Sequence, residues 1–228
     1  MLLYYITDRT AFAADEPTRY RRLLEKIHEA AVARVDYIQL REKDLSTRNL
    51  ESLAREAVTA IREALSTAHN PLSTALLINS RTDVALAVGT DGVHLRSDDV
   101  CAGEIIAIWK KCGTGAPARV ARPPQIAVSC HSPAEVAQAA VEDATVAVFA
   151  PVFDKKDAPP AGLNALREAC RAKIPVLALG GVTLSNARSC LEVGAAGIAA
   201  IRLFQENDIA GIVKHLRQIS VDRTRPKA

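Results

Sequence analysis

The segment LAVGTDGVHLRS (Leu86–Ser97) carries the pattern that decides the fold. It is typical of a helix end, followed by a glycine at the C-cap (Gly89), a second glycine and a short strand. A related pattern returns in LEVGAAGIAAIRL (Leu191–Leu203), with Gly194 in the place of Gly89. The two copies stand four strand–helix units apart, which predicts an array of eight such units.

Short apolar, β-branched-rich runs alternate with amphipathic segments along the whole chain. In the helical segments, such as residues 50–65 and 209–216, apolar residues recur at steps of three and four and form a stripe that can cover a sheet. The predicted strands are Leu3–Thr7, Tyr37–Leu40, Leu76–Asn79, Gly92–Leu95, Ile126–Ser129, Val146–Ala150, Val176–Leu179 and Gly197–Ile201. This alternation favours a closed parallel barrel, the α/β fold called the (β/α)8 TIM barrel. A doubly wound open sheet is the alternative, because a sequence does not show whether the strand order reverses.

The length and composition fit a single domain. The chain has 228 residues, of which 49% are hydrophobic, and no linker divides it. The stretch at 112–124, rich in Gly, Pro and Arg, lies between a predicted helix and a predicted strand and is typical of a surface loop. We therefore expect one barrel domain over residues 1–220 and a polar, frayed tail over 221–228.

Charge and cysteine usage exclude several classes of function. A net charge of +3 is too small to indicate a nucleic-acid or anionic-membrane partner. The apolar N-terminus lacks the basic start of a signal peptide and reads as a first strand, and no apolar run is long enough for a membrane span. Five cysteines without a C-x-x-C pair indicate neither a zinc cluster nor a disulfide framework and favour the cytoplasm. The sequence leaves open whether the chain forms a homodimer.

Polar residues stand at nearly every predicted strand end, which is where barrels of this kind build their active sites. In chain order they are Asp8, Arg9, Gln39, Arg41, Lys43, Asn79, Ser80, His94, Arg96, Asp98, Asp99, Ser129, His131, Lys155, Lys156, Gly180, Gly181 and Arg202.

The stretch YIQLREKD (Tyr37–Asp44) is the most informative of these strand ends. Gln39, Arg41 and Lys43 alternate with a period of two, so we expect all three side chains on the interior face, opening into the barrel mouth. Two cations and an amide in one pocket suit a polyanion such as pyrophosphate. The alternative is that the two cations pair with Glu42, Asp44 or a carboxylate of another strand.

Three further candidates each have two interpretations. Gly180-Gly181, after the seventh strand, is either a phosphate cradle or a tight turn. Asp98 and Asp99 either hold Mg²⁺ or decorate a helix N-terminus. His131 either acts as a general base or is hydrogen-bonded into the barrel rim.

Several motifs together resemble one family, the thiamine-phosphate synthases, which include the similar thiazole tautomerases. The motifs are YYITDR, YIQLREKD, LLINSRTDVALAVGTDGVHLRSDD, SCHS, APVFDKKDAPPAGL, VLALGGV and GAAGIAAIRLF. They occur in the family's order and extend over nearly the whole chain. The resemblance implies a barrel transferase of thiamine biosynthesis that joins hydroxymethylpyrimidine pyrophosphate to thiazole phosphate. Pyrophosphate leaves first in a dissociative step, and the thiazole nitrogen captures the resulting carbocation.

The resemblance also implies roles for individual residues. Gln39 contacts the pyrimidine, and Asp99 matches a ligand of Mg²⁺. Gly181 matches the backbone site for the thiazole phosphate, with Ile201 and Arg202 beside it. The residues expected to hold pyrophosphate are Arg41, Lys43, Asn79, Ser129 and Lys155; those expected to be catalytic are Arg41, Lys43, Ser129, His131 and Lys155.

The chain departs from the family's usual pattern in four places. Ser80 stands where an aspartate usually binds the metal, so we expect weaker Mg²⁺ binding unless Asp98 or a water substitutes. Arg96-Ser97 stands where the family usually has Gly-Gln before its acidic residues, and Arg96 either adds a cation or fills the metal's place. Arg202 replaces a serine that helps hold the thiazole phosphate. Asp154 follows the PVF motif directly, so a threonine-bearing segment is missing from the loop after the sixth strand.

Two alternative functions stay open. The tautomerase branch aromatises a thiazole carboxylate phosphate by proton transfer, and His131 in the SCHS motif fits its acid/base residue. The other alternative is a catalytically silent paralogue that binds a thiamine precursor. Retention of the phosphate-site residues, which are Arg41, Lys43, Asn79, Asp99 and Lys155, favours the synthase.

Overall fold

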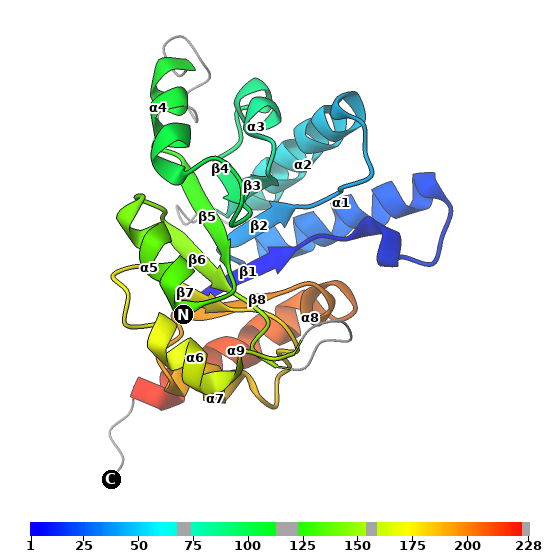
Figure 1. The fold of residues 1–228 in the computed structure, drawn as a ribbon. Coiled ribbons are helices and arrows are strands. Elements are labelled where there is room, and N and C mark those ends of the chain that lie inside the picture. Colours follow the sequence, from blue (N-terminus) through cyan, green and yellow to red (C-terminus); the bar gives the residue numbers. More distant parts are fainter. Residues whose placement is uncertain (68–73, 113–122, 154–158, 225–228) are drawn as a thin grey trace.

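The computed structural model is a closed barrel of eight parallel strands with helices around it (Figure 1). It describes residues 1–67, 74–112, 123–153 and 159–224. The strands follow one another in chain order, and β8 pairs with β1 to close the ring. The prediction of a TIM barrel is therefore confirmed, and the open doubly wound sheet is excluded.

Each predicted strand is present with ends that lie within one residue of the prediction. The strands are β1 (Leu2–Ile6), β2 (Tyr37–Leu40), β3 (Ala75–Asn79), β4 (Gly92–Leu95), β5 (Gln125–Cys130), β6 (Val146–Phe149), β7 (Val176–Ala178) and β8 (Gly197–Ala200). Strands buried on both faces read as short apolar runs, which is why the sequence located them so well.

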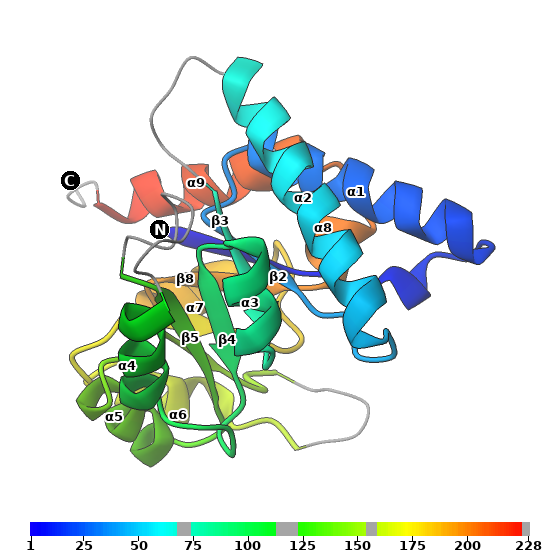
Figure 2. The same ribbon diagram turned by 90° about the horizontal axis from the view of Figure 1, so that it is seen from above.

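The helices pack around the outside of the strands, as the view from above shows (Figure 2). They are η1 (Arg9–Ala11), α1 (Glu16–Val32), α2 (Thr47–Thr67), α3 (Thr82–Val88), α4 (Ala102–Cys112), α5 (Pro133–Val141), α6 (Gly162–Ala169), α7 (Ala187–Glu192), α8 (Arg202–Gln205) and α9 (Ile209–Thr224). The two helical segments predicted from periodicity lie in α2 and α9. The tail expected from residue 221 begins within α9, and residues 225–228 lie outside the described part. None of the described helices has the length and apolarity needed to cross a membrane.

The paired glycines of the repeated pattern have a structural reason. Gly89 ends α3 in the left-handed region with φ of 71°, the conformation that glycine adopts at least cost. Gly92 and Gly197 begin β4 and β8, where a Cβ atom would lie 1.8 Å from the Gln125 carbonyl oxygen and 1.9 Å from that of Leu2. At these two positions a neighbouring strand passes too closely for any side chain.

Side chains pack in two layers on either side of the strands. The outer layer fills the space between strands and helices, and its large members include Tyr5, Trp109, Phe149 and Phe204. The inner layer fills the barrel with Tyr4, Ile6, Leu77, Ala127, Val146, Val148, Leu177 and Ala199. Because these side chains occupy the interior, a ligand has access only to the ends of the barrel.

Candidate functional site

A cavity of 760 Å³ opens at the carboxyl ends of the strands. It gathers every described residue that the family resemblance assigned to the site except Asp99, whereas the strand-end candidates Asp8, Arg9, Ser80 and Asp98 do not line it. The residues that it gathers are Gln39, Arg41, Lys43, Asn79, Ser129, His131, Gly181, Ile201 and Arg202. Lys155, the remaining predicted residue, lies in 154–158, outside the described residues.

The side chains of Gln39, Arg41 and Lys43 line this cavity in steps from floor to rim. Gln39 is buried, Arg41 is half-buried and Lys43 is exposed. This is the alternation that the period of two predicted. Among the described residues, no carboxylate forms an ion pair with Arg41. The alternative in which Arg41 is neutralised by a neighbouring acid therefore finds no support in that part of the chain.

Glu42 and Asp44 bind a different arginine. The Arg9 side chain, only 4% exposed, donates from Nη1 to Glu42 Oε2 at 3.2 Å and from Nε to Glu16 Oε1 at 2.7 Å. It also binds both oxygens of Asp44. Arg9 does not line the cavity, although its strand-end position suggested a functional role. Instead it fixes the acidic side of the segment after β2.

Thr7 links this anchor to the residue that faces the cavity. Its hydroxyl donates to Glu42 Oε1 at 2.6 Å and accepts the Arg41 backbone N–H at 3.0 Å. The backbone that carries Arg41 is thus held by the end of β1, and the guanidinium is left on the cavity side.

Gln39 and Asn79 form the floor next to these cations. Gln39 Nε2 donates to Asn79 Oδ1 at 2.8 Å. Gln39 Oε1 is buried and has no hydrogen-bond partner among the described residues. Leaving a buried acceptor unpaired costs about 1–3 kcal/mol, so this oxygen is suited to accept a hydrogen bond from a ligand.

His94 also lines the cavity, although its place in the sequence marked it only as one of many polar strand ends. Its Nδ1 lies 2.7 Å from the Tyr4 hydroxyl and its Nε2 lies 2.8 Å from Ser129 Oγ. Burial, with a contribution from the positive charge of Arg41, lowers the pKa of His94 to about 3. The imidazole is therefore neutral at physiological pH, and it connects the barrel interior to Ser129.

His131 is hydrogen-bonded at the barrel rim, as one of its two interpretations predicted, and its role as a general base stays a prediction. Its side chain lines the cavity, and its Nδ1 lies 2.8 Å from the Ala150 carbonyl oxygen on the rim. A carbonyl oxygen can only accept, so Nδ1 carries the proton and Nε2 is the acceptor nitrogen of the neutral ring.

Asp99 lies beside the cavity and is occupied by protein donors. Its Oδ2 accepts from Ser80 Oγ at 2.7 Å and from the Arg96 backbone N–H at 2.8 Å, and its Oδ1 accepts from Arg96 Nη2 at 3.2 Å. Burial alone would raise the pKa of Asp99, but these hydrogen bonds outweigh it and lower the pKa. The carboxylate is therefore ionised, and it is already paired with the guanidinium of Arg96.

The Gly180-Gly181 turn is both a tight turn and part of the cavity wall. The φ angles are 94° and 65°, and a Cβ on Gly180 would lie 2.8 Å from the Pro151 Cα. Asn186 holds the turn by accepting the Thr183 N–H at 2.8 Å and donating to the Gly181 carbonyl oxygen at 2.9 Å. Only glycine combines these dihedral angles with so close an approach to Pro151.

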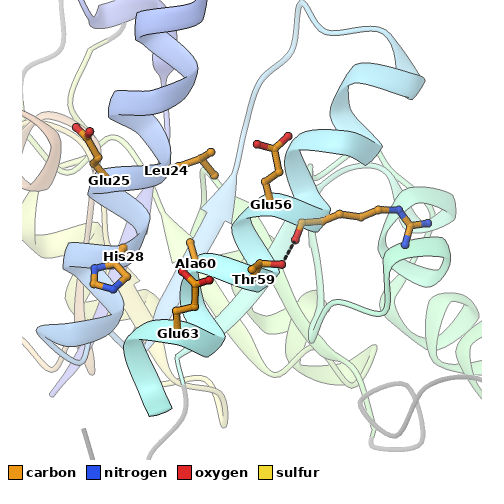
Figure 3. Close-up of a pocket in the computed structure, with 8 residues that line it drawn as sticks. Leu24, Glu25, His28, Glu56, Thr59, Ala60 and Glu63 are labelled. Carbon is orange, nitrogen blue, oxygen red and sulfur yellow. Dashed lines mark hydrogen bonds between the residues drawn. The ribbon is translucent and has the colours of Figure 1, made fainter. Parts of the chain in front are cut away.

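A second hollow lies on the outside of the barrel between α1 and α2 (Figure 3). Its walls carry the carboxylates of Glu25, Glu56 and Glu63, with His28 and Arg55 as the basic side chains. A predominantly acidic groove does not suit phosphate groups. The cavity at the strand ends is therefore the candidate site.

Comparison with known proteins finds relatives that match nearly the whole chain. Residues 3–204 match the sequence profile of the family described as thiamine monophosphate synthase. A thiamine-phosphate synthase from Roseiflexus castenholzii is 37% identical over 205 residues, covering 88% of this chain and 79% of the relative. One from Syntrophomonas wolfei is 35% identical, covering 95% of each chain. Among solved structures, the thiamine phosphate pyrophosphorylase of Pyrococcus furiosus superposes with a TM-score of 0.75 at 29% identity, covering 98% of this chain and 97% of that one.

Proposed function

Because the chain belongs to the thiamine monophosphate synthase family, we propose that its cavity binds hydroxymethylpyrimidine pyrophosphate together with thiazole phosphate. The chain is a transferase of the thiamine-phosphate synthase type, and its products are thiamine phosphate and pyrophosphate. The observation that carries the site assignment is the Arg41 guanidinium, which faces the cavity without a carboxylate partner among the described residues.

The reaction balances without any further reactant. The bond between the pyrimidine methylene carbon and the pyrophosphate oxygen breaks, and its electron pair leaves with pyrophosphate. The lone pair of the thiazole nitrogen then forms the new C–N bond to the carbocation. Since negative charge gathers on the leaving pyrophosphate, donors and cations fixed around it lower the barrier most.

The floor and one wall of the cavity supply those groups. Arg41 and Lys43 offer positive charge, and the Asn79 amide and Ser129 hydroxyl offer neutral donors at the same end. Gln39 Oε1, the buried acceptor without a partner among the described residues, accepts an N–H of the pyrimidine. Burial of that contact favours a ligand that carries a donor at this point over one that lacks it.

The thiazole phosphate fits the wall built by the ends of β7 and β8. Gly181, Ile201 and Arg202 line the cavity there. No hydrogen bond joins the Gly181 backbone N–H to another described residue, so it can donate to a phosphate oxygen. Arg202 adds a cation whose fork of N–H groups suits phosphate.

The free thiols of the five cysteines fit a reducing compartment, and we propose that the reaction takes place in the cytoplasm.

Synthases of this family generally depend on Mg²⁺, but the donors that the described residues offer do not fit the ion. Mg²⁺ takes six oxygen ligands, usually with one or two carboxylates that are free to bind it. Here Arg96 pairs with both candidate carboxylates, those of Asp98 and Asp99. The Ser80 hydroxyl is bonded to Asp99 as well. The reaction proposed for this chain therefore uses only groups of the protein.

A two-substrate assay tests the proposal. The full chain, incubated with both substrates with and without Mg²⁺, should form thiamine phosphate and pyrophosphate in equal amounts. Arg41→Ala should reduce kcat/KM by about 10²–10³ because a cation aimed at the leaving group is lost. Arg55→Ala, on the outer face of α2, should leave it unchanged. Absence of product at every Mg²⁺ concentration would overturn the proposal, and turnover of a thiazole carboxylate phosphate alone would favour the tautomerase.

A further inference from the structure

Arg96 is a further cation of the cavity wall, beside Arg41 and Lys43. It follows β4 on the same interior face as His94, and its side chain lines the cavity. Arg41 follows β2, Asn79 ends β3 and Arg96 follows β4, and these three strands are neighbours in the barrel. The two arginines therefore flank Asn79 on one side of the cavity.

Acidic residues hold this guanidinium in place. Arg96 Nε lies 3.3 Å from Asp98 Oδ1 and 3.3 Å from Asp99 Oδ1. Nη2 lies 3.2 Å from the same Asp99 oxygen. The Arg96 backbone N–H also binds Asp99, so side chain and main chain are tied to the same carboxylate. Such ties reduce the rotamer freedom that an arginine loses on meeting a ligand.

The guanidinium also keeps donors for a ligand. An arginine has five N–H donors, and the closest contacts to Asp98 and Asp99 are made by Nε and Nη2. Nη1 forms no hydrogen bond with an acid in the described part of the chain. Its two N–H groups can therefore meet a phosphate oxygen while the acids remain bound.

We propose that Arg96, held by Asp98 and Asp99, binds the pyrophosphate directly, and that its charged N–H donors act at the place where a synthase of this type otherwise recruits a divalent ion. The inference rests on the proposed function, because it concerns the same leaving group. Arg96 is then a further residue in direct contact with substrate, and the chain binds and releases pyrophosphate without Mg²⁺.

Binding measurements separate this inference from the activity itself. In titration calorimetry, the full chain should bind inorganic pyrophosphate in the presence of EDTA. When EDTA is replaced by Mg²⁺, the Kd for pyrophosphate should change less than threefold. Arg96→Gln should weaken binding in EDTA by about tenfold or more, the loss expected for a charged hydrogen bond. Arg96→Lys keeps the charge, and its Kd for pyrophosphate should lie between that of the unmodified chain and that of Arg96→Gln. Arg55→Gln is the matched control, because its side chain is 55% exposed and ion-paired, like that of Arg96, which is 57% exposed.

A metal titration gives a second readout. Followed by the electron paramagnetic resonance of Mn²⁺, the unmodified chain should bind no ion at up to about 1 mM. Arg96→Gln frees both carboxylates and should create a weak site. Stoichiometric Mn²⁺ binding by the unmodified chain, or pyrophosphate binding that appears only with a metal, would overturn the inference. Thiamine phosphate formed only with Mg²⁺ would also overturn it while leaving the proposed function intact, and no product under any condition would count against the function instead.

Discussion

The guanidinium of Arg9 meets the carboxylate of Asp44 through two parallel contacts, Nη1 to Oδ1 at 2.7 Å and Nη2 to Oδ2 at 2.8 Å. This fork geometry joins the end of β1 to the segment that carries Arg41 and Lys43. Hydrogen bonding from Arg9 lowers the pKa of Asp44, so the pair stays charged at neutral pH. The segment that carries the cavity cations is thus held by an ion-pair cluster that does not line the cavity.

Removing Arg9 should destabilise the whole barrel. Arg9→Met leaves Glu42, whose side chain is 1% exposed, without its ionic partner. Breaking a buried pair from one side costs about 3–5 kcal/mol, and urea unfolding should show a loss of this size in the free energy of unfolding. Arg21→Met is the control, since its pair with Glu25 is exposed and contributes less than about 1 kcal/mol. Equal stability of the two variants would contradict a structural role for Arg9.

The chain of hydrogen bonds from Tyr4 through His94 to Ser129 should set the direction of the Ser129 hydroxyl. His94 is the only hydrogen-bond partner of the Tyr4 hydroxyl among the described residues. If that hydroxyl donates to Nδ1, then Nε2 carries the proton and donates to Ser129, whose own proton is left for pyrophosphate. Nitrogen-15 NMR of His94 should therefore report Nε2 as the protonated nitrogen.

A double-mutant cycle tests the consequence for catalysis. Tyr4→Phe should lower kcat/KM in the unmodified chain and have little effect in a Ser129→Ala background, which gives a coupling of about 1 kcal/mol. Tyr5→Phe is the matched control, because it removes an equally buried hydroxyl that bonds to Gln205 in the outer layer. Additive effects of Tyr4→Phe and Ser129→Ala would show that His94 is merely structural.

Stability should fall in mildly acidic solution because of His94. Its pKa is about 3 in the folded chain and near 6.5 when unfolded, so between these values the unfolded state binds one more proton. The contribution of His94 is thus complete above pH 6.5 and is lost as the pH falls, by about 1.4 kcal/mol per pH unit. His94→Gln should flatten the slope of unfolding free energy against pH between 6 and 4. An unchanged slope in that variant would rule out His94 as its source.

A metal site should be recoverable by two substitutions. Ser80→Asp combined with Arg96→Gln removes the guanidinium and places a second carboxylate beside Asp99, the kind of donor set that Mg²⁺ prefers. Ser80 already has φ of 54°, a left-handed conformation that aspartate adopts more readily than most residues. Product formation by the double variant should depend on Mg²⁺, as measured by titration of EDTA-treated protein. Activity that ignores the metal would speak against this reading of positions 80 and 96.

The sequence was sufficient for the strands and for the side of the barrel on which Arg41 lies. Both depend on local periodicity, and the interior of a closed barrel preserves it. Pairings between distant segments could not be read in the same way. Arg9 reaches Glu42 across 33 positions, and His94 reaches Tyr4 across 90. Which partner a charged or polar side chain selects depends on distances that only the closed barrel defines.

The alternation at the end of β2 has a consequence for how this enzyme tolerates change. Gln39, Arg41 and Lys43 point into the cavity, while Glu42 and Asp44 bind Arg9 behind it. In a saturation screen, neighbouring positions should therefore fail for opposite reasons: substitutions at 41 and 43 should yield abundant, folded, inactive protein, and those at 42 should reduce the amount of protein in the cell. A selection for growth without thiamine would report all of these positions as intolerant. Only a parallel measurement of protein abundance would separate the positions needed for activity, 41 and 43, from position 42, which is needed for folding.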